Sequence, residues 1–146
     1  MINDNITVTG KLNVVLIDEM GAVKEDHVFD NLVVTSGKSF IASRMKDATA
    51  TVMTHMAIGT DNTTAAAGNT ALGSQANRQA LTSTTVNTNA VTYAATFAGG
   101  QGTGAIVEAG LFNASSGGTM LCRTVFPVIN KAAADTLSVS WVVTVS

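Results

Sequence analysis

The sequence predicts a mainly β protein, an antiparallel β-sandwich of about eight strands with one short helix near residues 37–46. In the C-terminal half, apolar and polar residues alternate with a period of two, which is typical of strands that bury one face. Segments rich in glycine and serine at residues 99–104 and 114–118 have the composition of turns. We expect a jelly roll. An immunoglobulin-like sandwich is the competing arrangement, but a single cysteine cannot supply the disulfide of a true immunoglobulin domain.

The expected strands follow one another with short antiparallel connections. In the first of them Gly10 is a candidate bulge, and Pro127 ends the seventh, where its missing N–H indicates a sheet edge or a bulge. The helix covers residues 37–46, with Ser36 as its N-cap. The eight expected strands are residues 6–18, 22–29, 53–58, 78–87, 91–97, 105–113, 119–126 and 137–145.

Length and composition exclude several classes of protein. A chain of 146 residues is typical of one domain, so we expect residues 1–146 to form a single sandwich. The net charge is −2, without the clusters of Lys and Arg that nucleic-acid binding needs. No apolar run approaches the ~18 residues of a membrane span, and we expect no secretory signal. The one cysteine, Cys122, fits assembly in a reducing cytoplasm.

Charged residues are scarce and unevenly placed. Residues 1–73 carry eight acids and five bases, whereas residues 74–146 carry only Arg78, Glu108, Arg123, Lys131 and Asp135. Ionisable groups usually carry catalysis, so this scarcity argues against an enzyme. Small uncharged side chains cost little to desolvate, which favours a surface that packs against other protein. The alternative is a sandwich with a threonine-rich surface and no partner.

One segment contains part of a phosphate-binding motif. Ser36-Gly37-Lys38-Ser39 includes the Gly-Lys-Ser of a phosphate-binding loop, but Leu32 stands where that motif needs its first glycine. We therefore expect the start of a helix, with Lys38 exposed.

The remaining candidates for chemistry are isolated. His27 and His55 have no neighbouring His or Cys at metal-ligand spacing, and the acids of the first hairpin lack a calcium-loop pattern. Glu108 has no second acid within 26 residues, so a paired-carboxylate mechanism is not indicated. We expect Glu108 to bond to Arg123 across a hairpin, and Cys122 to be part of the core. The sequence thus predicts no catalytic residue, no cofactor and no metal.

Residues 59–73 have neither helical nor strand periodicity and form an expected long loop. Such a loop in a compact domain is usually functional or ordered by a partner. We expect it to be a contact arm that is mobile in the free protein. The candidate structural and interface residues are Glu108 and Arg123 and, in the loop, Thr60, Asn62, Thr63, Thr64 and Asn69.

Three blocks, the first of them in two parts, together resemble a known group of proteins. The first is MAIGT at residues 56–60 before a Thr/Ala loop that ends in TALG at 70–73; the others are EAGLFN at 108–113 and MLCRTVF at 120–126. In combination they resemble small virion proteins of tailed bacteriophages. The EAGLF hairpin with the following RTVF strand also resembles modules of phage tail-collar and fibre proteins. The resemblance covers residues 56–146 well and the first third of the chain only loosely.

The resemblance implies a non-enzymatic structural protein, assembled in the bacterial host cytoplasm and acting in the virion. Capsid decoration (cement) proteins of this size are often β-sandwich or jelly-roll oligomers. The implied partners are therefore the major capsid protein and copies of the chain itself, as a homodimer or homotrimer. The chain has no heptads or collagen-like repeat, which favours the head over a fibre. The alternatives are a tail fibre, collar or baseplate adaptor, and a carbohydrate-binding sandwich, which would need exposed aromatic residues.

Overall fold

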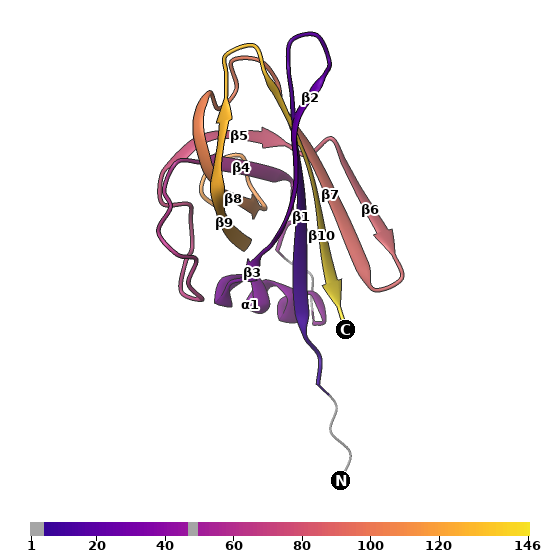
Figure 1. Cartoon of the computed structure of the whole chain (residues 1–146). Coiled ribbons are helices and arrows are strands. Elements are labelled where there is room, and N and C mark those ends of the chain that lie inside the picture. The colour runs from indigo at the N-terminus through magenta and orange to yellow at the C-terminus, as the bar shows by residue number, and fades with distance from the viewer. Residues whose placement is uncertain (1–4, 47–49) are drawn as a thin grey trace.

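The chain forms two antiparallel five-stranded sheets with one short helix at one end (Figure 1). A computed structural model describes residues 5–46 and 50–146. Sheet A has the order β2 (Val23–Asp30), β1 (Val8–Ile17), β10 (Thr136–Val145), β7 (Ala90–Phe97), β6 (Ser83–Asn87). Sheet B has the order β3 (Leu32–Val33), β9 (Met120–Lys131), β8 (Gly104–Phe112), β4 (His55–Gly59), β5 (Gln75–Ala80). The predicted mainly β fold with one short helix is confirmed; the jelly-roll arrangement stays a prediction.

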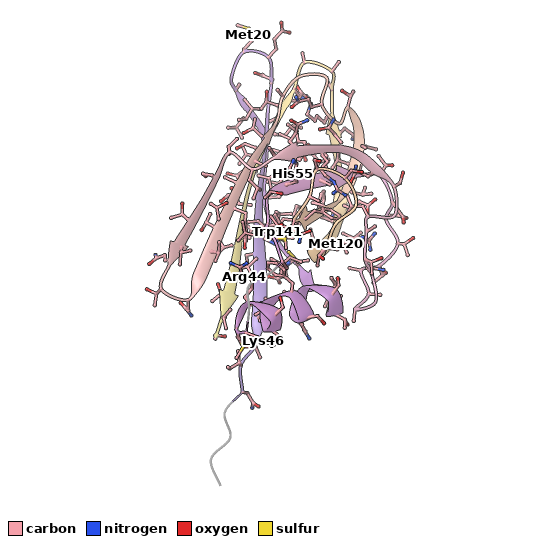
Figure 2. The ribbon with its side chains drawn as sticks, turned by 180° about the vertical axis from the view of Figure 1, so that it is seen from behind. Met20, Arg44, Lys46, His55, Met120 and Trp141 are labelled. Carbon is pink, nitrogen blue, oxygen red and sulfur yellow. The ribbon has the colours of Figure 1, made fainter. Side chains whose placement is uncertain are left out.

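The core lies between the two sheets and follows the predicted alternation. In β10 every second residue is buried, and Trp141, fully buried, pairs with Leu12 of β1 on one side and Tyr93 of β7 on the other. Figure 2 shows Trp141 in the interior, whereas Met20 stands at the tip of the β1–β2 hairpin, 90% exposed. Fully burying one large apolar side chain stabilises a fold by roughly 1.5–3 kcal/mol, so this alternation supplies the main driving force.

The expected strand over residues 78–87 is wrong. The chain crosses from sheet B to sheet A in the middle of it, so that β5 and β6 lie in different sheets. At the crossing, the N–H of Leu81 donates to Thr54 O (2.9 Å) and that of Thr82 donates to Ala94 O (2.8 Å). The crossing contains no glycine or proline, so no turn signal marks it. The two-residue β3 was also not predicted, because two residues are too short to show a period.

The predictions made for Gly10 and Pro127 have different outcomes. The pairing of β1 with β10 continues without a shift past Gly10, so the expected bulge there is wrong. Gly10 leaves room for Asn31: a Cβ at this position would lie 2.0 Å from Asn31 Oδ1, so a larger residue would displace that side chain. Pro127 does not end its strand, because β9 runs on to Lys131. The predicted bulge is present, since the β8–β9 register shifts between Ile106 and Glu108, opposite Pro127.

The helix α1 spans Thr35–Arg44 and begins before its expected start. The predicted cap is wrong: Val34 is the N-cap, and Ser36 Oγ instead donates to Met120 O (3.0 Å). Gly37 is buried against β9, where an added Cβ would lie 2.0 Å from Leu121 O. The glycine of the Gly-Lys-Ser segment therefore allows close packing of helix on sheet, and Lys38 is exposed as expected.

Candidate interaction site: a loop held by a buried ion pair

Both ends of the long loop are hydrogen-bonded to the buried carboxylate of Glu108. The backbone N–H of Asp61 donates to its Oε2 (3.0 Å), as does that of Ser74 (2.8 Å), and the N–H of Gly73 donates to Oε1 (2.9 Å). Arg123 donates to Oε1 from Nε (3.1 Å) and Nη2 (3.0 Å). The Glu108 side chain is 0% exposed. A buried carboxylate is tolerated only when it is paired and hydrogen-bonded, and these five donors satisfy it.

Arg123 holds the middle of the same loop. Its Nη1 donates to Thr63 O (3.0 Å) and to Asn69 Oδ1 (3.1 Å). Asn69 Oδ1 also accepts the N–H of Ala66 (2.9 Å), so the guanidinium and a loop turn share one acceptor. Arg123 is 2% exposed and is thus committed to the loop and to Glu108. The ion pair expected from the sequence is present, and its consequence is a loop backbone fixed at several points.

A bulge explains why Glu108 faces the loop and not the core. With strict alternation Glu108 would share a face with Ile106, which lies in the core between the sheets. The register shift between these two residues turns Glu108 to the outer face of sheet B, a usual role of bulges. Sequence alternation alone does not reveal such a change of face, although Pro127 on the partner strand was a signal of it.

The loop covers the outer face of sheet B. Beneath it lies a second small apolar cluster of Val34, Ala57, Phe112 and Met120, against which Leu72 of the loop packs. Two glycines allow the close approach. A Cβ on Gly59 would lie 2.4 Å from Ser74 O and 2.6 Å from Glu108 Oε2, and one on Gly73 would meet the Asp61 carboxylate. Sequence reasoning missed Asp61, Gly73 and Ser74, for which the glycines beside the loop were the only available signal.

The loop residues singled out from the sequence divide into two groups. Thr60, Thr63 and Asn69 hold the loop together: Thr60 Oγ1 donates to Ser74 Oγ (3.1 Å), and Thr63 donates from N and Oγ1 to Asp61 Oδ1 (3.0 and 2.8 Å). These bonds from Thr63 lower the pKa of the Asp61 carboxyl. Asn62 and Thr64 are exposed on the outside. The expectation of a free arm therefore differs from the structure, in which the side chains are exposed but the backbone is fastened.

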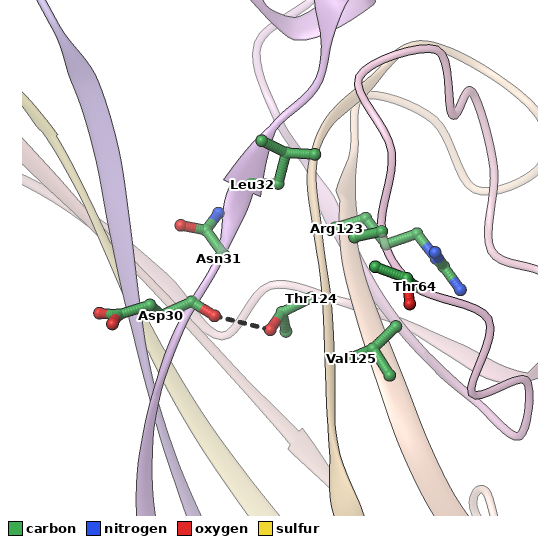
Figure 3. A pocket seen from close by; sticks show the side chains of 8 residues that line it. Asp30, Asn31, Leu32, Thr64, Arg123, Thr124 and Val125 are labelled. Atoms are coloured by element: carbon green, nitrogen blue, oxygen red, sulfur yellow. Dashed lines mark hydrogen bonds between the residues drawn. The ribbon is translucent and has the colours of Figure 1, made fainter.

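A shallow hollow of about 340 Å³ lies beside the loop (Figure 3). Thr64 and Arg123 border one side of it, and Asp30 and Asn31 border the other. Some of its polar groups are engaged: Thr124 Oγ1 donates to Asp30 O (2.8 Å), and the Arg123 guanidinium points into the loop contacts. The side chain of Asn31 differs, because its Oδ1 and Nδ2 are buried without a hydrogen-bond partner. The hollow offers a shape for a neighbouring surface.

The other charged residues of the C-terminal half hold loops in the same way. Arg78 donates from Nη1 to Ala114 O (3.0 Å) and Gly117 O (2.9 Å) and stacks 3.7 Å from the centre of the Phe112 ring. Lys131 Nζ donates to Ala98 O (2.9 Å), and its burial lowers its pKa. Each of these cations thus ties a connecting segment to a strand.

No metal-binding cluster is found in the described parts of the chain. His27 Nε2 lies 3.0 Å from Glu25 Oε1, and His55 Nδ1 lies 2.8 Å from Thr54 Oγ1. Within residues 5–46 and 50–146, no three His, Cys, Asp or Glu residues gather where they could hold a metal ion. Among the same residues no helix has the length and apolar character needed to cross a bilayer.

Comparison of the chain with protein-family models, with curated proteins and with solved structures found no match.

Proposed function

We propose that this chain is a non-enzymatic structural protein of a tailed-phage virion, a capsid decoration protein that bridges neighbouring capsid subunits. The observation that carries the proposal is the fastened loop. The blocks that resemble phage virion proteins supply the residues that fasten this loop. Gly59 and Gly73 come from the two parts of the first block, Glu108 from the second and Arg123 from the third. The residues behind the resemblance thus serve to present one loop surface whose fully exposed side chains are uncharged.

A loop of this kind suits docking onto another protein. Its backbone is ordered before binding, so association does not have to fix about fifteen residues at ~1–2 kcal/mol each. Its outer side chains are Thr, Ala and Asn, which lose little free energy when water is removed. Many copies, each bound weakly to the shell and to one another, would hold a particle firmly through multivalency.

The fold supports the same proposal in one respect. The two antiparallel sheets enclose one core, as in a double-sheet jelly roll, and β1 and β10, the strands nearest the two chain ends, are neighbours in sheet A. We keep the jelly roll as part of the proposal. The major capsid protein and copies of this chain are the proposed partners, and the virion is the proposed location.

A tail fibre, collar or baseplate adaptor is the second candidate, favoured by the EAGLF hairpin that builds β8. The carbohydrate-binding alternative receives no such support. All seven aromatic residues are buried or half-buried, so none of them forms an exposed platform on which a sugar could stack.

The test uses phage particles from which the gene has been deleted. Purified chain should co-sediment with these particles and decorate their heads in electron micrographs. Thr64→Lys, on the exposed side of the loop, should weaken binding about tenfold or more, because a lysine would have to be desolvated there. Thr103→Lys is the matched control, since Thr103 is exposed in the connection between β7 and β8 and is not part of the loop, and it should bind normally.

Two outcomes would contradict the proposal: absence of binding to the particle, or equal binding by Thr64→Lys. Decoration of tails in place of heads would support the second candidate.

A further inference from the structure

The two sheets have four edge strands, and three of them are protected against pairing with another strand. β2 carries Lys24, Glu25, Asp26 and Asp30 and has a register shift near its start. β3 is only two residues long. β5 carries Arg78, and its pairing with β4 shifts between Ile58 and Gly59. Charges, short length and bulges are the usual protections of a sheet edge.

The fourth edge strand, β6, has none of these protections. Its five residues, Ser-Thr-Thr-Val-Asn, pair with β7 in unbroken register, and all five are exposed, Val86 at 71%. No charged residue occurs in the sequence between Arg78 and Glu108. In Figure 1 the β6–β7 hairpin extends past sheet B, which leaves the edge open. Backbone groups on the outer side of such a strand are available to another strand.

We infer that β6 pairs with β6 of a second copy, antiparallel and across a two-fold axis, to join the two A sheets into one. This inference rests on the self-association in the proposed function and not on the location in the particle. Pairing over the whole strand places Thr85 opposite Thr85 of the second copy, with Ser83 opposite Asn87 and Thr84 opposite Val86. Cross-strand pairs of β-branched residues are favourable, and here no like charges face each other.

The same geometry limits the assembly to two copies. An interface that is the same on both partners closes on itself as a dimer, whereas pairing between two different edges would build a ring or an open filament. Each chain has one unprotected edge, so pairing of β6 with β6 uses both and leaves none for a third copy.

Disulfide trapping tests the register in the purified chain. Directly opposed residues of antiparallel strands have Cα atoms about 4.5–5.5 Å apart, within the range of a disulfide. Thr85→Cys should therefore form a covalent dimer under mild oxidation. Thr103→Cys, exposed in a turn, is the control and should cross-link much more slowly. The native Cys122 does not interfere, because it is buried and burial raises the pKa of its thiol.

Sedimentation equilibrium tests the affinity. The native chain should dimerise with little dependence on salt, since no charges meet at β6. Thr85→Lys should raise the dissociation constant about tenfold or more, because two lysines would face each other, and Thr103→Lys should not. A native chain that stays monomeric at millimolar concentration, or a dimer that Thr85→Lys does not weaken, would overturn the inference.

Both measurements use the isolated chain, so they are independent of the particle experiment. A dimer that fails to bind particles would refute the proposed function alone. A monomer that binds them would refute only the pairing through β6.

Discussion

The charged residues of the two halves of this chain have opposite roles. In residues 1–73 every described charged side chain is exposed or half-buried, and the acids gather on the β1–β2 hairpin. In residues 74–146 four of the five charged residues are buried, namely Glu108, Arg123, Lys131 and Asp135, and the fifth, Arg78, is half-buried. Apart from Asp61, whose carboxylate accepts two hydrogen bonds from Thr63 within the loop, the first group hydrates a surface. The second group holds connecting segments to strands.

This difference explains how a sheet protein can have a long loop whose exposed side chains are uncharged. A loop backbone needs hydrogen-bond partners, and charged groups form stronger hydrogen bonds than neutral ones. Placing the charge inside the domain gives the loop its partners and leaves Thr, Ala and Asn outside. The few charged residues of the C-terminal half are therefore scarce on the surface because they lie inside the domain, where they bond to loop backbones.

The largest expected effect is on Glu108. Glu108→Ala leaves Arg123 buried without its partner and removes the acceptor of three loop N–H groups. Breaking a buried ion pair from one side typically costs about 3–5 kcal/mol, and we expect a loss of this size in the free energy of unfolding. Urea denaturation measures it. Hydrogen exchange at Asp61, Gly73 and Ser74 should accelerate more than in the core.

Glu19→Ala provides the comparison from the other half, because Glu19 is an exposed acid at the hairpin tip. It should change the free energy of unfolding by less than about 0.5 kcal/mol. Equal effects of the two substitutions would show that the contrast between the halves is not energetic.

A second prediction concerns two glycines of the loop region. In Gly59→Ala the new Cβ would lie 2.4 Å from Ser74 O, so the loop must move away from Glu108. Overpacking of this kind costs about 1–3 kcal/mol. Gly68→Ala should be neutral or slightly stabilising, because nothing lies within 4 Å of its Cβ. Thermal unfolding of the two variants, side by side, checks the difference; a loss in Gly68→Ala as large as in Gly59→Ala would contradict it.

A third prediction concerns Arg78, which is half-buried between Phe112 and the loop that joins β8 to β9. Arg78→Ala should cost about 1–2 kcal/mol, from the lost hydrogen bonds to Ala114 and Gly117 and the lost ring contact. Lys38→Ala, an exposed cation of the first half, should stay within about 0.5 kcal/mol. Urea midpoints measure both. If they shift equally, Arg78 does not hold the hairpin loop.

Sequence patterns predicted the strands whose alternation is regular. β10 is the clearest, because each of its inward residues is apolar and its register with β1 and β7 is unbroken. The sequence patterns failed where one or two residues change the direction of a strand. Leu81 and Thr82 carry the chain from one sheet to the other with no turn residue, so two strands were predicted as one.

The sequence predicted the central ion pair of the candidate site, but not that this pair holds the loop. Glu108 and Arg123 could be matched because each lacks another partner nearby in sequence. Their contacts with Thr63, Asn69 and Ser74 could not, since these join residues 34 to 60 positions apart. Such contacts depend on how the loop folds over sheet B, which no local period encodes.

The smallest expected effect is on an ion pair that joins the two groups of charges, Lys24–Asp135, with 2.9 Å between Nζ and Oδ2. The bond from Lys24, and then the bond from the N–H of Ala132, lower the pKa of the Asp135 carboxyl below its usual value near 3.8. A lowered folded-state pKa means that the pair stabilises the protein at pH values above the unfolded-state pKa of Asp135. This contribution is lost as the pH falls through the folded-state pKa.

Asp135→Asn should therefore be less stable than the native chain at pH 6, and the difference should shrink below about pH 4. Because Lys24 is 41% exposed, added salt should reduce the difference as well. Urea midpoints of both proteins at pH 6 and pH 3 measure it. The lowered pKa of Asp61 acts equally in both proteins and cancels. A difference that stays constant between the two pH values would mean that Asp135 acts through its bond to the N–H of Ala132 and not through its charge, and the link between the two halves would then be structural only.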